Sequence, residues 1–168
     1  MHASATDLIY YARIARKLGL FGCAADSLQF ISQIPSLTAG DCFLRIIEQI
    51  KCYLGAKTPE NDRANLEVIE QTSLRYFKAH EQAEILALKA KLQFKAKIQG
   101  QDPNKTFSHA VQLFDSNQAW GLWAEHLVQE HMTQPENAPS ALTALLQAMG
   151  LLFLNEKKLY LLQSFFFL

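Results

Sequence analysis

A spacing of 34 residues relates two neighbouring segments between residues 83 and 148. Apolar or small residues recur at this spacing, namely Leu86 and Trp120, Ala90 and Ala124, and Ala110 and Ala144. The period is typical of tetratricopeptide-like helix-turn-helix repeats, in which small residues allow two antiparallel helices to approach closely. The spacing therefore predicts an all-α, tetratricopeptide-like helical-repeat solenoid.

Apolar residues with helical spacing follow one another along most of the chain, separated by short polar stretches that contain glycine or proline. Short connections favour antiparallel neighbours, so we expect about four antiparallel helix pairs. The predicted helices run from a cap at Thr6 and Asp7 to Gly19, from Gly22 to Gln33, from a cap at Asp41 to Gly55, from Arg63 to Tyr76, from Glu81 to Ile98, around Phe107 to Phe114, around Trp120 to Leu127, and onward from Ser140. No segment alternates apolar and polar residues for long enough to predict a strand.

Two further expectations concern the buried side of the first helix and the C-terminal end of the chain. Leu8, Tyr11, Ile14 and Ala15 share one side of the first helix, and we predict that this side is buried. Residues 1–154 read as helical repeats, whereas residues 155–168 form an atypical apolar tail. Because an end repeat normally carries a polar outer face, we expect the chain to be a fragment of a longer solenoid.

Composition limits the classes of partner. The 168 residues are 49% apolar, which suits one domain with a sizeable core. Sixteen basic and sixteen acidic residues balance, so direct nucleic-acid binding is not expected. Neither apolar run near the C-terminus reaches the roughly 20 residues that a membrane span requires, so no membrane partner is expected.

Motifs that carry chemistry are missing from the sequence, and we predict no enzyme, no cofactor and no catalytic or metal-binding residue. There is no glycine-rich phosphate loop, nucleophile elbow or zinc-binding HExxH. His126 and His131 are five residues apart, about 140° around a helix, and are poorly placed as joint ligands. We interpret them as polar helix-face residues. The alternatives are a metal site that includes Glu125 or Glu130, and a small helical enzyme built on His126 and a carboxylate. The helical carboxylates read as solvated faces, namely Glu67, Glu70, Glu81, Glu84, Glu125 and Glu130.

Cysteines and aromatic residues are assigned to packing. Cys23, Cys42 and Cys52 are odd in number and lack metal-ligand spacing, so we interpret them as buried packing residues in a reducing compartment. Four aromatic residues are expected in the core between repeats, with a platform for a ligand or peptide as the alternative, namely Tyr10, Tyr11, Trp120 and Trp123.

One basic cluster is a candidate partner surface. It comprises Lys89, Lys91, Lys95, Lys97 and Lys105. An acidic partner segment is one candidate occupant, and a solvated face balanced by local acids is the interpretation that we favour. The cluster also supports an alternative function, a stand-alone helical-repeat peptide-binding adaptor.

Several runs resemble a known family. They span residues 41–54, 66–77, 87–90, 104–113 and 119–123, and they are similar to the FAT region of the phosphatidylinositol-3-kinase-related kinase family, in its pseudokinase branch. The resemblance extends over about residues 20–154, so the predicted domain 1–154 would consist of FAT-type repeats. The stretch 133–139 looks shorter than the family's loop, and residues 155–168 match it poorly.

The resemblance implies a role as well as a fold. It implies a non-catalytic scaffold segment of a nuclear transcription coactivator, of the SAGA-type and NuA4-type histone acetyltransferase complexes. The implied partners are protein subunits of these complexes and transcription activators. The kinase-like domain of this branch lacks catalytic residues and would lie C-terminal to the segment, so no catalytic residue is carried over to this chain.

Overall fold

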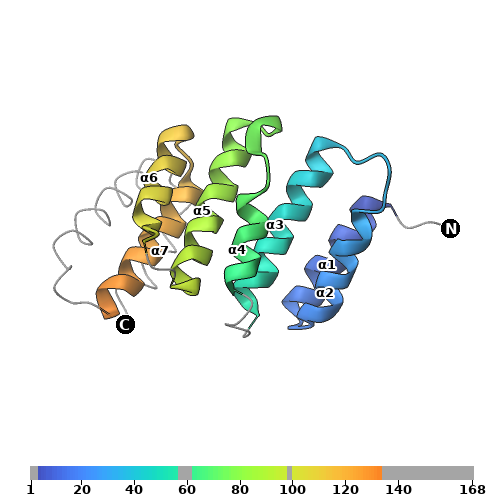
Figure 1. The fold of residues 1–168 in the computed structure, drawn as a ribbon, viewed down its shortest axis with the longest axis horizontal. Helices are drawn as coiled ribbons and strands as arrows, with labels where there is room; N and C mark the ends of the chain where they lie inside the picture. Colours follow the sequence, from blue (N-terminus) through green and yellow to red (C-terminus); the bar gives the residue numbers. More distant parts are fainter. Residues whose placement is uncertain (1–3, 57–61, 98–99, 134–168) are drawn as a thin grey trace.

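The computed structural model describes residues 4–56, 62–97 and 100–133, and within these ranges all regular structure is helical (Figure 1). The elements are α1 (Ala5–Lys17), α2 (Phe21–Ile31), α3 (Ala39–Gly55), α4 (Asp62–Glu70), the 3-10 turn η2 (Leu74–Tyr76), α5 (Ala79–Ala96), α6 (Pro103–Leu113) and α7 (Asn117–Thr133). None of these helices is long and apolar enough to cross a bilayer. The predicted all-α class is confirmed.

The helices stack in pairs along the long axis of the molecule (Figure 1). Helix α1 packs against α2, α3 against α4, and α5 against α6, while α1, α3, α5 and α7 contact one another in succession. This arrangement confirms the predicted helical solenoid. The helix expected from Ser140 and the tail 155–168 lie outside the described residues.

Capping boxes decide where α1 and α3 begin. Ser4 is the N-cap of α1, and its hydroxyl accepts from the backbone N–H of Asp7, whose carboxylate accepts in return from the backbone N–H of Ser4. Thr38 and Asp41 form the same reciprocal arrangement at α3. The predicted caps at Asp7 and Asp41 are therefore wrong by three residues, because the acidic residue of a capping box is the third residue inside the helix.

The predicted helix from Arg63 to Tyr76 is wrong in its second half. Helix α4 ends at Glu70, where the Thr72 hydroxyl donates to the Val68 carbonyl, and the chain then forms the turn η2. The break lets Leu74 and Phe77 pack against the cluster between α3, α4 and α5. Burial of these two side chains favours the turn over the continuous helix that local spacing suggests.

Buried alanines occur at two of the junctions between helices. Three clusters occupy the junctions of α1 with α2 and α3, of α3 with α4 and α5, and of α5 with α6 and α7. Ala90 and Ala124, which are related by the 34-residue spacing, are both buried. Leu86 is buried as well, and its counterpart Trp120 is half-buried. Ala144 lies outside the described residues.

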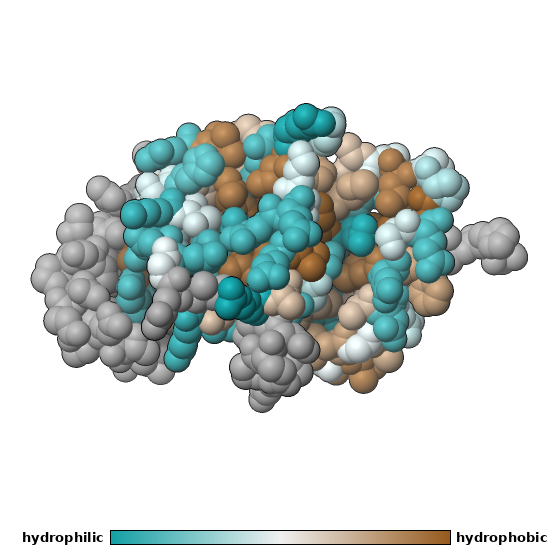
Figure 2. All heavy atoms as spheres, viewed as in Figure 1, coloured by the Kyte–Doolittle hydropathy of each residue, from teal (hydrophilic) through white to brown (hydrophobic). Residues whose placement is uncertain are grey.

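The prediction for the inner face of α1 is wrong for Tyr11 and Ile14, whereas Ala15 is buried and Leu8 packs against the core as expected. The structure buries Ile9, Ala12 and Ala15, whereas Tyr11 and Ile14 are exposed. Alanines on the inner side allow α2 and α3 to approach α1 more closely than a tyrosine would. Tyr10 is exposed as well, so neither tyrosine belongs to the core. Figure 2 shows hydrophobic residues at the surface of this end of the molecule.

Candidate functional site: polar contacts between repeats

A buried carboxylate joins the first two repeats. Glu48 of α3 is 1% exposed, and its Oε1 and Oε2 accept from the Nε atoms of Arg13 and Arg16 of α1 at 2.8 and 2.9 Å. Both acceptor oxygens are thus paired with a cation, which offsets the cost of removing the charge from water. Sequence reasoning missed this site, although Glu48 lies between the apolar residues Ile47 and Ile50, and this position indicates burial.

The later repeats are joined in the same manner but nearer to solvent. Lys51 Nζ of α3 lies 3.8 Å from Glu84 Oε1 of α5, and the same oxygen accepts from Gln118 Nε2 of α7 at 2.7 Å. Lys91 Nζ of α5 lies 2.8 Å from Glu125 Oε2 of α7. We call these contacts, together with those of Glu48, the inter-repeat polar contacts. They join helices about one repeat apart.

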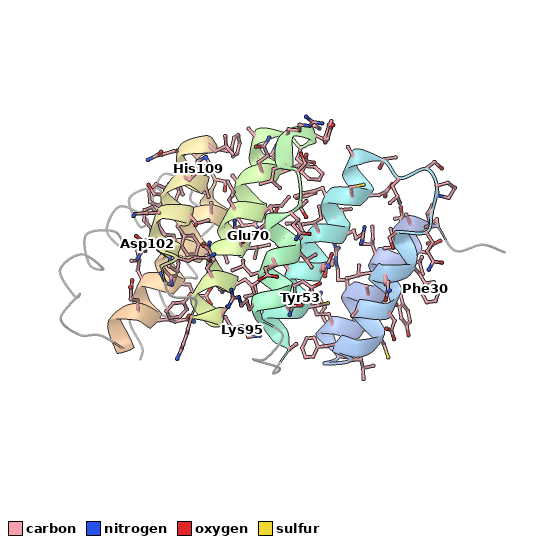
Figure 3. The ribbon with its side chains drawn as sticks, in the orientation of Figure 1. Phe30, Tyr53, Glu70, Lys95, Asp102 and His109 are labelled. Atoms are coloured by element: carbon pink, nitrogen blue, oxygen red, sulfur yellow. The ribbon has the colours of Figure 1, made fainter. Side chains whose placement is uncertain are left out.

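Three lysines of the basic cluster are engaged within the molecule. Lys91 pairs with Glu125, and Lys89 Nζ lies 3.3 Å from Glu70 Oε1 of α4. Lys95 Nζ donates to the carbonyls of Tyr53 and Ala56 at 2.6 Å each, at the C-terminal end of α3 (Figure 3). A cation at this position complements the carbonyls that a helix end leaves unpaired. Only part of the predicted partner surface is therefore solvent-facing.

The other two lysines are exposed. Lys97 has a left-handed backbone conformation with φ 49° at the C-terminal end of α5, and Lys105 lies in the first turns of α6. The structure places both lysines on the surface, and binding of an acidic segment by this cluster stays a prediction.

His126 is a core residue, and its interpretation as a polar helix-face residue is wrong. It is 1% exposed, and its ring lies 4.6 Å from that of Phe94 and 5.2 Å from that of Phe107 between ring centroids. Its Nε2 lies 3.7 Å from Glu130 Oε2. Burial lowers the pKa of His126, because the charged imidazolium loses hydration among the aromatic rings. Helical spacing from the buried Ala119 already places it on the inner side of α7.

The remaining candidate site residues are the possible metal ligands and the helical carboxylates that were predicted to lie on solvated faces. Among the described residues, no three potential ligands converge on one point, and the side chain of His131 lies outside them. Among the described residues, Glu67 pairs with the exposed Arg63 of its own helix, as expected for a solvated face. The other carboxylates of the predicted faces contact a neighbouring residue or helix end, namely Glu70, Glu81, Glu84, Glu125 and Glu130.

The tryptophans pack against each other at the α6–α7 junction. Their ring centroids are 5.2 Å apart, and the Trp123 ring stacks on the buried Phe107 at 6.2 Å. Trp123 Nε1 donates to Asn104 Oδ1 at 2.9 Å, which satisfies its polar atom. This geometry agrees with the packing interpretation of Trp120 and Trp123.

The cysteines divide by burial. All three are free thiols; Cys52 is buried, Cys42 is half-buried and Cys23 is exposed. The packing interpretation is therefore wrong for Cys23, which lies on the outer side of α2. Burial raises the pKa of Cys52 to about 11 and keeps its thiol protonated.

Comparison with known proteins places this arrangement in a family. The FAT domain family matches residues 1–152. The Transformation/transcription domain-associated protein of Danio rerio is 41% identical over an alignment of 155 positions, which covers 88% of this chain. Transcription-associated protein 1 of Drosophila melanogaster is 36% identical over an alignment of 177 positions, which covers 100% of this chain. The SAGA complex/NuA4 acetyltransferase complex subunit TRA1 of Saccharomyces cerevisiae is 30% identical over 156 residues, covering 89%.

The match covers only a short part of each relative. The aligned region is 4% of the length of the Danio rerio and Saccharomyces cerevisiae proteins and 5% of the Drosophila melanogaster protein. The runs that carried the resemblance, such as residues 41–54, lie inside the matched region. This chain therefore belongs to the FAT domain family and is similar to a short segment of the transformation/transcription domain-associated proteins.

Proposed function

We propose that this chain is a non-catalytic scaffold segment of a nuclear transcription coactivator and histone acetyltransferase complex. The observation that carries the proposal is the 30% identity, over 89% of the chain, to a protein named as a SAGA and NuA4 acetyltransferase complex subunit. Its partners would be protein subunits of such a complex and transcription activators. The balanced charge of the chain favours proteins over nucleic acid as direct partners.

The structure supports a mechanical role. Many of the charged side chains contact neighbouring helices, and Glu48 joins α1 to α3 from a buried position. Stacked helices with a fixed register form an elongated surface on which bound proteins keep constant relative positions. A scaffold requires this rigidity, whereas it requires no converging set of catalytic groups.

Deletion and replacement test the proposal. The matching segment of the Danio rerio relative is deleted, or replaced by this chain, and the protein is purified from nuclei. We expect deletion to reduce the acetyltransferase subunits that co-purify and to impair activator recruitment, and we expect the replacement to restore both. A deletion that leaves assembly and recruitment unchanged would refute the scaffold role.

The second candidate function is a stand-alone peptide-binding adaptor. The observation that favours it is the exposure of Lys97 and Lys105 near the α5–α6 connection. Reversal of both charges to glutamate should weaken the binding of an acidic peptide, whereas Lys17→Glu, on the exposed end of α1, serves as the matched control. Equal binding by all three proteins rules out this surface.

A further inference from the structure

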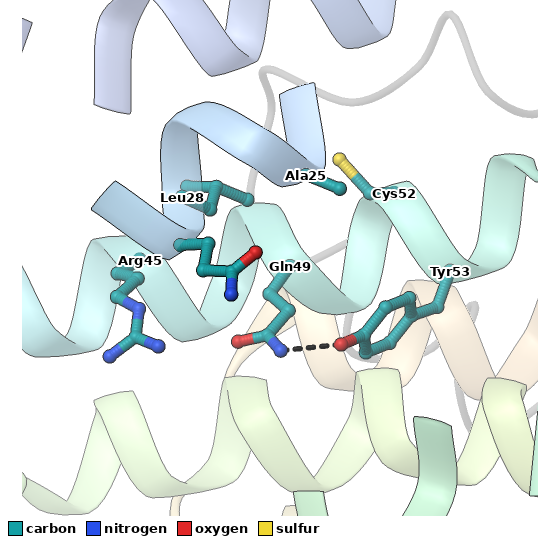
Figure 4. Close-up of a pocket in the computed structure, with 7 residues that line it drawn as sticks. Ala25, Leu28, Arg45, Gln49, Cys52 and Tyr53 are labelled. Atoms are coloured by element: carbon teal, nitrogen blue, oxygen red, sulfur yellow. Dashed lines mark hydrogen bonds between the residues drawn. The ribbon is translucent and has the colours of Figure 1, made fainter. Parts of the chain in front are cut away.

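A groove of about 230 Å³ lies between α2 and α3 (Figure 4). Its walls include the buried apolar side chains of Leu28 from α2 and Cys52 from α3. Three longer polar side chains also line it, Gln29 from α2 and Arg45 and Gln49 from α3. The groove therefore combines an apolar wall with hydrogen-bond donors.

The polar side of the groove follows from helical spacing. Arg45, Gln49 and Tyr53 are four residues apart and lie along one side of α3. Gln49 Nε2 donates to the Tyr53 hydroxyl, as the dashed line in Figure 4 marks. This contact holds the amide of Gln49 and the phenol of Tyr53 together. The guanidinium of Arg45 takes no part in it.

Arg45 is a cation whose neighbouring acids are engaged elsewhere. Asp41, four residues earlier, accepts from the backbone N–H and hydroxyl of Thr38 at 3.3 and 2.6 Å. Glu48, three residues later, uses both oxygens for the arginines of α1. Within the described part of the chain, Arg45 forms no ion pair, and its Nε is buried without a hydrogen-bond acceptor. A buried charged donor without an acceptor is costly, and a carboxylate would relieve that cost.

We propose that the α2–α3 groove binds a glutamate side chain of a partner protein, with Arg45 pairing with the carboxylate and Leu28 contacting the methylene groups. The planar guanidinium matches a carboxylate, and the apolar wall suits the aliphatic part of the same side chain. Nucleic-acid backbones are bound by several cations in a row, whereas this groove offers one. The inference rests on the proposed function in taking a protein as the partner.

Titration of the full chain with short capped peptides tests the groove. One peptide carries a single central glutamate flanked by leucines, and its twin carries glutamine. The readout is the ¹⁵N–¹H resonance of the Arg45 Nε–Hε group. We expect the glutamate peptide to shift this resonance saturably, and the glutamine twin to bind about tenfold more weakly, since hydrogen bonds to charged groups contribute more than neutral ones.

A matched pair of variants tests the role of the guanidinium. Arg45→Gln should weaken binding of the glutamate peptide about tenfold, whereas Arg63→Gln should leave it unchanged, because the Arg63 side chain is 79% exposed on α4. If Arg45→Gln does not fold, the shift of the Arg45 Nε–Hε resonance in the unaltered chain decides whether the guanidinium contacts the glutamate peptide. Equal binding of the twin peptides, or no saturable shift, overturns the inference. Free glutarate or inorganic phosphate binding as tightly as the peptide overturns the choice of a protein side chain.

The outcome is separable from the scaffold test. Loss of peptide binding in Arg45→Gln with normal co-purification of acetyltransferase subunits supports the groove and leaves the scaffold function standing. If the unaltered chain binds the peptide but the deletion leaves assembly and recruitment unchanged, the scaffold function is refuted and the groove proposal stands.

Discussion

Lys91 Nζ and Glu125 Oε2 lie 2.8 Å apart, and the two residues are separated by 34 positions in the chain. The separation equals the repeat spacing, so the ion pair joins equivalent positions of α5 and α7. Gln118 and Glu84, which hydrogen-bond at 2.7 Å, are also 34 residues apart. The repeat spacing in the sequence therefore corresponds to direct contacts between stacked helices.

Reversing one charge of this pair should weaken the stack. Lys91→Glu places two carboxylates together and should lower the free energy of unfolding by about 0.5–1 kcal/mol, because both side chains are partly exposed and water screens the pair. The exchange Lys91→Glu with Glu125→Lys should recover most of this loss. Urea unfolding of the four proteins in the cycle measures the coupling. A coupling energy of zero would show that the pair does not hold the helices together.

The Glu48 contact should be the stronger one. Glu48→Gln keeps the shape of the side chain but leaves Arg13 and Arg16 without a countercharge, so we expect a loss of about 3 kcal/mol. The matched control is Glu67→Gln, on a side chain that is 58% exposed, with an expected change below about 0.5 kcal/mol. Urea unfolding compares the two variants, and equal losses would contradict a structural role for the buried carboxylate.

His126 should make stability depend on pH. Glu130 and Asp102 favour its charged form and Lys91 opposes it, but burial is the largest influence and lowers its pKa. The unfolded chain takes up a proton near the ordinary pKa of about 6.5, whereas the folded chain does so only at lower pH. Stability is therefore fully present above about pH 6.5 and is lost as pH falls below it.

Substitution of His126 should remove this dependence. Unfolding free energies at pH 7.5 and 5.5 are compared for the unaltered chain and His126→Phe, with His109→Gln, at an exposed position, as the control. One histidine contributes at most about 1.4 kcal/mol per pH unit. An unchanged pH dependence in His126→Phe would assign the effect to other groups.

The three thiols should react at different rates. At pH 8 we expect an alkylating agent to modify the exposed Cys23 first and Cys52 only after unfolding, because the Cys52 thiol is buried and its pKa is raised to about 11. Mass spectrometry of timed samples follows each site, and the urea-unfolded chain supplies the control in which all three react alike. Early modification of Cys52 in the folded chain would contradict its burial.

Local sequence patterns predicted the positions of the helices well, but they predicted less well which side of a helix is buried. The first five helices were expected within a few residues of their observed starts, because capping and apolar spacing are properties of neighbouring residues. Tyr11 was wrongly assigned to the inner side of α1 because Tyr11 and Ala12 both lie on apolar arcs, and only the proximity of α2 and α3 selects the smaller residue. Helix α4 was predicted too long because the gain from burying Leu74 and Phe77 comes from other helices.

The sequence by itself determined the all-α class, the pairing of neighbouring helices and the repeat period, because these depend on residues close together in the chain. Tertiary structure alone decided which charges meet. Lys91 and Lys95 belong to one basic cluster in the sequence, but Lys91 pairs with Glu125 of α7 and Lys95 donates to carbonyls at the end of α3. Among the residues that the structure describes, Arg45 forms no ion pair although two acids lie within a helical turn of it, because Glu48 faces α1 and Asp41 caps its own helix. Electrostatic pairing depends on distances across helices, and the stacking of the repeats sets these distances.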